Sequence, residues 1–143
     1  RVYAGWAYSQ AFFRHELWRE QGFGSIEELL RFWEQDHLGQ DANDLLTVLN
    51  TWQNGDISDN PVFGMDFDAA LSAIAMPTRM MPCTTDLYFT REDASEDGLR
   101  MPGATVESLE SDWGHVAGGA GREAASHNRI LAAARALLSG KAS

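Results

Sequence analysis

Helical and extended sequence patterns alternate in the second half of the chain, and this alternation restricts the fold more than any other feature. Hydrophobic spacing predicts a helix, strand, helix, strand, helix order at 67–74, 78–81, 92–99, 105–111 and 123–138. Strands that alternate with helices form parallel βαβ units, so we predict an α/β fold. Parallel strands are normally paired on both sides, so these two strands need neighbours from missing sequence, another chain or a rearranged fold.

Two prolines and one apolar stripe agree with this pattern. Pro77 ends the helix before the first strand and Pro82 ends that strand, because proline has no backbone N–H to donate. In the last helix, the apolar residues that we expect to pack on the sheet are Ile130, Leu131, Ala134, Leu137 and Leu138.

The first half of the chain carries helical patterns with recognisable ends. Ser25 followed by Glu28 is a capping-box pattern and predicts a helix over 26–38. Asp41 is a possible cap of a second helix, which we expect to end near Asn54. The first half is therefore predicted to be mainly helical.

A run of turn-forming residues at 56–61 separates the two halves. We predict a helical lid at residues 1–60 and carboxyl-terminal β-α units at residues 61–143. The large aromatic residues of the first half are expected to form a core between the lid helices. Four of them could also roof a substrate tunnel or form a dimer contact, namely Trp6, Tyr8, Phe12 and Trp52.

Asp86 and His115 each follow one of the two predicted strands. Their separation of 29 residues has room for one loop, one helix and one strand, which places the ends of two adjacent parallel strands side by side. A carboxylate that accepts a hydrogen bond from imidazole Nδ1–H orients a histidine base and stabilises the imidazolium. We therefore predict that Asp86 and His115 are the acid and base of a catalytic triad.

Glycine surrounds the predicted base. Gly114 before His115 and the Gly118-Gly119 pair after it allow a tight backbone path that leaves the imidazole at the edge of the sheet. The structural alternative is that Asp86 only caps a turn and that His115 is an ordinary loop histidine.

Three segments resemble a known family. Asp41–Leu45, Asp86–Phe89 and Trp113–His115 look like the corresponding segments of homoserine O-acetyltransferase and its close relatives in the α/β-hydrolase superfamily. In that superfamily the chain order is nucleophile, acid, base, which agrees with the order of the two residues here. The resemblance covers most of the chain and implies the carboxyl-terminal portion of an α/β-hydrolase fold, with a helical lid before the last two strands.

The nucleophile that this resemblance implies does not occur in the sequence. A Gly-x-Ser-x-Gly segment is absent, and the nearest match, Gly22-Phe23-Gly24-Ser25, lacks the required spacing. We therefore expect the isolated chain to be inactive, with the amino-terminal half of the same protein as its partner. The opening residue, Arg1, also favours a partial product.

The resemblance further implies two-step acyl transfer by the intact protein. Acetyl-CoA is the implied acyl donor, the acceptor is a small molecule, and no cofactor is tightly bound. His115 would take the serine proton and then activate the acceptor hydroxyl. Lids in this family often dimerise, so a homodimer through the lid is expected.

Val116 departs from the family pattern, because homoserine acetyltransferases usually carry an acidic residue directly after the catalytic histidine. The acceptor is therefore left open. One alternative is a serine esterase, in which water is the acceptor. Another is a non-catalytic helical interaction module that retains the aspartate and histidine.

Composition excludes several classes of partner. A formal net charge of -10 opposes binding to nucleic acid or an anionic membrane. The longest nearly apolar stretch, 69–76, has 8 residues, whereas a membrane-spanning helix needs roughly 20. No signal-peptide pattern occurs and the single cysteine cannot form an intramolecular disulfide, so we expect a cytoplasmic protein.

The remaining reactive side chains predict no metal site. His15, His37 and His127 lack ligand spacing to one another or to Cys83. Cys83 is expected to be a small buried residue that could also line the pocket. Arg79 lies in an otherwise apolar strand and, if buried, needs a carboxylate or carbonyl partner.

Overall fold

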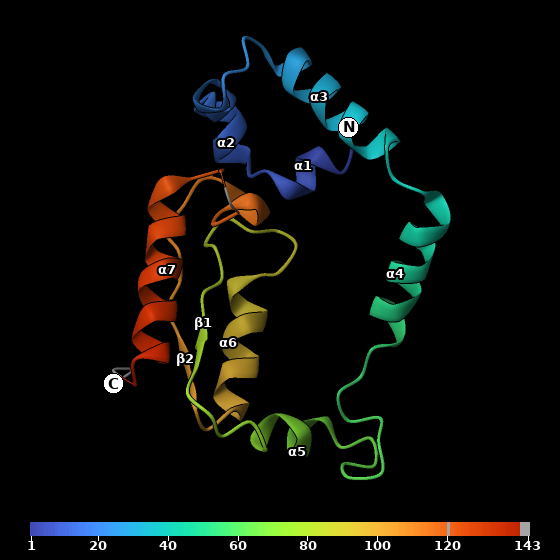
Figure 1. Cartoon of the computed structure of the whole chain (residues 1–143), viewed down its shortest axis with the longest axis vertical. Coiled ribbons are helices and arrows are strands. Elements are labelled where there is room, and N and C mark those ends of the chain that lie inside the picture. Colours follow the sequence, from blue (N-terminus) through green and yellow to red (C-terminus); the bar gives the residue numbers. More distant parts are fainter. Residues whose placement is uncertain (120, 141–143) are drawn as a thin grey trace.

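The computed structural model of the chain describes residues 1–119 and 121–140. Short helices begin the chain, two longer helices follow, and the second half alternates helices with two strands (Figure 1). The α-helices are α1 (Ala4–Ala7), α2 (Gln10–Arg14), α3 (Ile26–Leu38), α4 (Ala42–Asn54), α5 (Phe67–Ser72), α6 (Arg91–Arg100) and α7 (Ala124–Leu138). The strands are β1 (Thr78–Met80) and β2 (Ala104–Val106), and the 3-10 helices are η1 (Leu17–Gln21) and η2 (Gly114–Val116).

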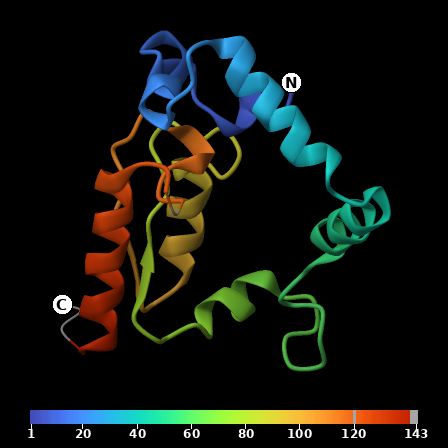
Figure 2. The ribbon, with the colours of Figure 1, turned by 45° about the horizontal axis from the view of Figure 1, so that its top comes forward.

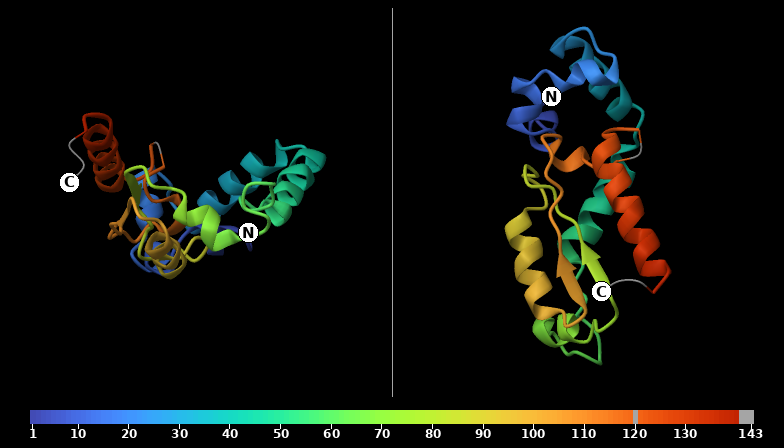
Figure 3. Two further views of the ribbon diagram at one scale, coloured as in Figure 1. Left: turned by 90° about the horizontal axis from the view of Figure 1, so that it is seen from below. Right: turned by 90° about the vertical axis from the view of Figure 1, so that its left-hand side faces the viewer.

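The two strands form the parallel βαβ unit that the sequence predicts. Thr78 pairs with Ala104 and Met80 pairs with Val106, with α6 as the crossover between the strands. The strands lie between α6 on one face and α7 on the other (Figure 3). The predicted α/β fold with flanking helices is therefore confirmed.

The second strand is shorter than predicted, because the expected extended segment 105–111 is regular strand only as far as Val106. Beyond that point pairing continues, with Leu109 donating its N–H to the Pro82 carbonyl at 2.8 Å and Thr84 donating to the Leu109 carbonyl at 3.0 Å. Pro82 lies two residues before Thr84, on the edge of the strand that faces β2, and has no N–H to donate. The ladder therefore loses one bond and resumes as an isolated bridge between Cys83 and Leu109.

The two long helices of the first half begin at the predicted caps. The Ser25 hydroxyl accepts a hydrogen bond from the Glu28 N–H at 3.2 Å, and the Glu28 carboxylate accepts one from the Gly24 N–H at 2.7 Å. The Asp41 carboxylate accepts a hydrogen bond from the Asn43 N–H at 2.7 Å at the start of α4. The predicted helices at 26–38 and near 42–54 are confirmed.

A cluster of aromatic and small side chains forms the buried core and joins the two halves of the chain. Seven of its eight buried members come from the first 33 residues, and the eighth is Trp113, which lies directly before η2. The Phe12 and Trp113 rings meet edge to face, with 5.2 Å between their centroids. The amino-terminal helices are therefore packed against the segment that leads into η2 (Figure 2).

The structure decides between core and surface roles for the four aromatic residues that could also roof a tunnel or contact a partner. Tyr8 and Phe12 are fully buried, so neither can roof a tunnel or contact a partner. Trp6 and Trp52 are about half exposed. α4 contributes no buried residue and stands apart from the sheet in Figure 1.

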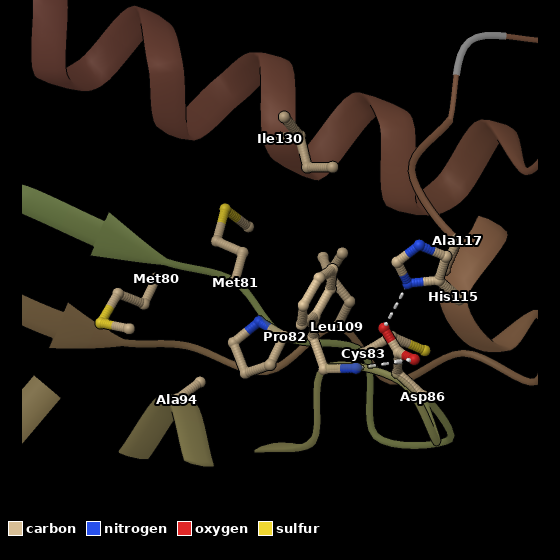
Figure 4. Close-up of a pocket in the computed structure, with 11 residues that line it drawn as sticks. Met80, Met81, Pro82, Cys83, Asp86, Ala94, Leu109, His115, Ala117 and Ile130 are labelled. Atoms are coloured by element: carbon tan, nitrogen blue, oxygen red, sulfur yellow. Dashed lines mark hydrogen bonds and ion pairs between the residues drawn. The ribbon is translucent and has the colours of Figure 1, made fainter. Parts of the chain in front are cut away.

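The predicted stripe of α7 is only partly correct. Leu138 is 90% exposed and Leu131 is 38% exposed, so neither is packed fully on the sheet. Ile130 faces the cavity near the carboxyl end of β1 (Figure 4). Two strands are too narrow to cover a helix of four turns, which leaves part of the stripe open.

Arg79 has the carboxylate partner that its place in an apolar strand requires. Its Nη1 lies 3.2 Å from Glu107 Oε2, and Arg129 Nη2 lies 2.6 Å from Glu107 Oε1. Glu107 therefore connects β1 to α7. The hydrogen bond from Arg129 is the main reason that the pKa of Glu107 is lowered, and the charges of Arg129 and Arg79 lower it further.

Within the described ranges 1–119 and 121–140, no helix combines the length and the apolar composition that are required to cross a bilayer.

Glu107→Gln should remove a pH-dependent part of the stability. Because the pKa of Glu107 lies below its ordinary value of 4.5 in the folded protein, its ion pairs stabilise the fold above that value. This contribution is lost as the pH falls through the lowered pKa. We therefore expect the variant to unfold at a lower urea concentration at pH 7 and to match the wild type in acid.

The control is Glu110→Gln, which changes an exposed glutamate on the same segment. Urea titrations of both variants across pH measure the difference. A deficit for the Glu107 variant that stays constant from pH 7 into acid would contradict the ion-pair explanation.

Candidate active site

The Asp86 side chain is held by the turn that follows β1. Its Oδ1 accepts hydrogen bonds from the backbone N–H of Tyr88 at 2.7 Å and of Phe89 at 3.2 Å. Asp86 N–H donates to the Cys83 carbonyl at 3.2 Å, which closes the turn. The Asp86 side chain is 8% exposed, so the carboxylate is fixed in a mostly buried position with Oδ2 still free to accept.

The segment before His115 is packed closely against the connection between α1 and α2. Gly114 has a φ of +67°, and a Cβ built on it would lie 2.8 Å from the Ser9 nitrogen and 2.9 Å from the Ala7 carbonyl oxygen. Only glycine combines this backbone conformation with so close an approach. The Ser9 hydroxyl also donates to the Asp112 carbonyl, which anchors the same segment.

Asp86 and His115 meet as the sequence predicts. Asp86 Oδ2 lies 3.0 Å from His115 Nδ1, and the other ring nitrogen faces away from the carboxylate (Figure 4). An ionised carboxylate can only accept a hydrogen bond, so Nδ1 carries the proton in this pair. In the neutral ring Nε2 is then unprotonated, which is the state that a general base requires.

Aromatic rings surround the imidazole. The ring centroid of Tyr88 lies 4.8 Å from that of His115, and the Phe89 centroid lies 5.3 Å away. Tyr3 contacts Tyr88 at its edge, with 5.9 Å between centroids. Burial, followed by the effects of Tyr88 and Asp86, raises the pKa of Tyr3 above its ordinary value.

Asp86 and His115 both line a cavity of about 380 Å³. Its other walls are largely apolar and include Met81, Leu109 and Ile130 (Figure 4). Cys83 lines this cavity too and is 6% exposed, so the structure supports both roles considered for it.

A second histidine–carboxylate pair was not predicted. His15 Nδ1 lies 2.9 Å from Asp112 Oδ2, and the His15 side chain is 53% exposed. Neither residue lines the cavity that holds Asp86 and His115. The pair joins residues 97 positions apart, so local sequence patterns carry no signal for it.

Metal ligation has no geometric support in the part of the chain that the structure describes. Residues 1–119 and 121–140 contain no group of three or more histidine, cysteine, aspartate or glutamate side chains that could hold a metal ion.

Comparison with curated proteins finds relatives with two related activities. The chain is 31% identical over 116 residues to a protein of Corynebacterium glutamicum named as a probable esterase, and 33% identical over 113 residues to an ethyl acetate hydrolase of Pseudomonas veronii. It is 29% identical over 112 residues to a homoserine O-acetyltransferase of Chlorobaculum tepidum. These matches cover 77–80% of this chain and 30–33% of the relatives, so the chain spans about a third of their length. No family model matches.

Solved structures agree with this result. The acetyl esterase MekB matches 96% of the chain with a TM-score of 0.83 and 31% identity, and the match covers 39% of that structure. An acetylester hydrolase from Corynebacterium glutamicum matches 80% of the chain with a TM-score of 0.74 and 31% identity, over 33% of its own length. The chain belongs to the α/β-hydrolase superfamily.

Within this superfamily the relatives do not single out homoserine O-acetyltransferase. The probable esterase, the ethyl acetate hydrolase and the homoserine O-acetyltransferase match similar shares of the chain. The fold expected from the sequence is confirmed, because the chain matches the carboxyl-terminal part of α/β-hydrolase structures. The narrower resemblance is supported only at the level of the superfamily.

Gly114→Ala should destabilise the protein more than an alanine at another glycine of positive φ. The matched control is Gly22→Ala, because Gly22 has a φ of +86° and open space where a Cβ would lie. The control should cost about 1–2 kcal/mol for the left-handed backbone alone. At Gly114 the collision with the Ser9 and Ala7 backbone should add about 1–3 kcal/mol.

Urea unfolding of the two variants measures both free energies of unfolding. Equal losses at the two positions would show that the close approach of the His115 segment to the amino-terminal helices has no energetic importance.

Proposed function

We propose that this chain supplies the acid and the base of a Ser-Asp-His triad in an esterase that acts on small acyl esters. The observation that carries the proposal is the 3.0 Å contact between Asp86 Oδ2 and His115 Nδ1 at the wall of an apolar cavity. Support for ester hydrolysis comes from the relatives named as a probable esterase and as an ethyl acetate hydrolase.

In this proposal the nucleophile lies outside the 143 residues. Their sequence contains no Gly-x-Ser-x-Gly segment, whereas the relatives are about three times as long as the region that they share with this chain. A serine placed beside His115 Nε2 would complete the triad. The same outside segment would supply the backbone N–H groups that stabilise the oxyanion.

The proposed reaction proceeds in two steps. The serine Oγ attacks the ester carbonyl carbon while its proton passes to His115 Nε2, and the alcohol then leaves with that proton as the carbon–oxygen bond of the ester breaks. A water molecule next attacks the acyl carbon while one of its protons passes to Nε2. The bond between the acyl carbon and the serine Oγ then breaks, and Nε2 returns that proton to Oγ, which gives the free acid and the free serine. Asp86 stays ionised throughout and stabilises the imidazolium.

A second candidate function is acyl transfer. It is favoured by the homoserine O-acetyltransferase relative and by the resemblance of the segments around Asp86 and His115. Acetyl-CoA would then be the donor, and an acceptor hydroxyl would replace water in the second step. Product analysis separates the two functions, because only transfer gives an acylated acceptor.

The non-catalytic interaction module is not favoured by the geometry. A module that only retained the two residues would place no requirement on their surroundings, yet the paired Asp86 carboxylate is mostly buried and both residues line the same largely apolar cavity.

Asp86→Asn should lower kcat for hydrolysis of p-nitrophenyl acetate by about 10⁴-fold, because the amide favours the wrong tautomer of the histidine. His115→Gln should remove the base and give at least as large a loss. The measurement uses the longest natural form of the protein that contains these residues.

The matched control is Asp112→Asn, which makes the same change in the exposed pair with His15, away from the cavity. This variant should keep the wild-type kcat. If the Asp86 and Asp112 variants behaved alike, the assignment of Asp86 to the triad would be wrong.

A further inference from the structure

A single hydroxyl joins the loop that carries Asp86 to the loop that carries His115. Thr85 Oγ1 donates a hydrogen bond to the Ser111 carbonyl at 2.7 Å and accepts one from the Gly114 N–H at 3.1 Å. Thr85 directly precedes Asp86, and Gly114 directly precedes His115. The contact therefore connects the two residues adjacent to the acid–base pair.

The chemistry of this contact requires a group that both donates and accepts. The Ser111 carbonyl accepts from Thr85 at 2.7 Å and more weakly from Cys83 Sγ at 3.4 Å, and the Gly114 N–H needs an acceptor. A hydroxyl provides both from one atom, whereas a valine of the same shape provides neither. Replacing Thr85 by valine would leave two backbone groups without these partners, at a partly buried position.

The strand ladder cannot hold the loops at this point. Regular pairing ends at Met80 and Val106, and the last bridge joins Cys83 and Leu109. Beyond this bridge, Thr85 continues the connection between the two segments through its side chain instead of the backbone.

We propose that Thr85 is a positioning residue that sets the distance and orientation of the Asp86–His115 hydrogen bond. This inference rests on the proposed function. Thr85 affects the reaction only through its effect on the Asp86–His115 pair. The amino-terminal helices hold the His115 segment from its other side, through the Ser9 hydroxyl and the Asp112 carbonyl. On the side of the carboxylate, Thr85 Oγ1 contacts both the Ser111 carbonyl and the Gly114 N–H of this segment, and Cys83 Sγ contacts only the Ser111 carbonyl.

Thr84 offers a matched control on the same loop. Its hydroxyl donates to the Leu109 carbonyl at 3.3 Å, whereas the Thr85 hydroxyl bonds the segment 111–115. Thr84→Val therefore removes the same kind of group one residue away. Thr85→Ser keeps the hydroxyl and loses only a methyl group, so it tests whether the hydroxyl is the important part.

The first readout is the ¹⁵N NMR signal of the His115 ring, assigned by its loss in His115→Gln. We expect an exchange-protected Nδ1–H in the wild type, in Thr85→Ser and in Thr84→Val, and a mixture of tautomers in Thr85→Val. All spectra are recorded at one pH, because a change in the protonation of a nearby group would also change the His115 signal. Asp86 and Tyr88 contact the His115 ring, and Cys83 lines the same cavity. Circular dichroism and urea unfolding establish that each variant is folded.

The second readout is ester hydrolysis by the longest natural form. Thr85→Val should lower kcat by about 10- to 100-fold with little change in KM, since misplacement of a catalytic group by about 1 Å has effects of this size. Thr85→Ser should recover most of the rate.

The two readouts separate failure of this inference from failure of the proposed function. A folded Thr85→Val variant that keeps both the protected Nδ1–H and the wild-type kcat would overturn the positioning role, even if Asp86→Asn is inactive. If Thr85→Val loses the protected Nδ1–H while Asp86→Asn keeps full activity, the positioning role stands and the proposed triad fails.

Discussion

The burial of Trp113 among the aromatic side chains of the first helices is the interaction on which the arrangement of the cavity depends. Trp113 is 3% exposed and meets Phe12 edge to face, an arrangement that contributes about 0.5–1.5 kcal/mol beyond the burial of the rings. Because the next two residues are Gly114 and His115, fixing this indole also fixes the start of the histidine loop. The amino-terminal helices thus hold one member of the Asp86–His115 pair in place.

The other member is fixed by local backbone geometry, and the two constraints meet at one hydrogen bond. Asp86 uses Oδ1 to accept from the backbone of its own turn and Oδ2 to contact His115. This division leaves the carboxylate little freedom to rotate. In the proposed triad, this fixed geometry would hold His115 in place before substrate arrives, as preorganised sites do to lower an activation barrier. The exposed pair of His15 and Asp112 has a similar distance without such surroundings, so distance alone does not make a catalytic pair.

Features that depend on residues close together in the sequence could be predicted, whereas features that depend on contacts between distant residues could not. The caps at Ser25 and Asp41 act within three residues, and both helices begin where these residues indicate. The meeting of Asp86 and His115 followed from the rule that parallel strand ends share an edge of the sheet. The length of β2 was overestimated because the residue that lacks a backbone N–H, Pro82, lies on the other strand. The contacts of Thr85 join residues that are 26 and 29 positions apart, and no periodic pattern reveals them.

The most direct test of the proposed triad is to locate the nucleophile that His115 would serve. The longest natural form of the protein is treated with a fluorophosphonate, which reacts with activated serines, and the modified peptide is identified by mass spectrometry. We expect one modified serine in a Gly-x-Ser-x-Gly segment outside residues 1–143, and no modification in the His115→Gln variant. Modification of a residue within the 143, or labelling that persists without His115, would contradict the assignment of His115 as the base.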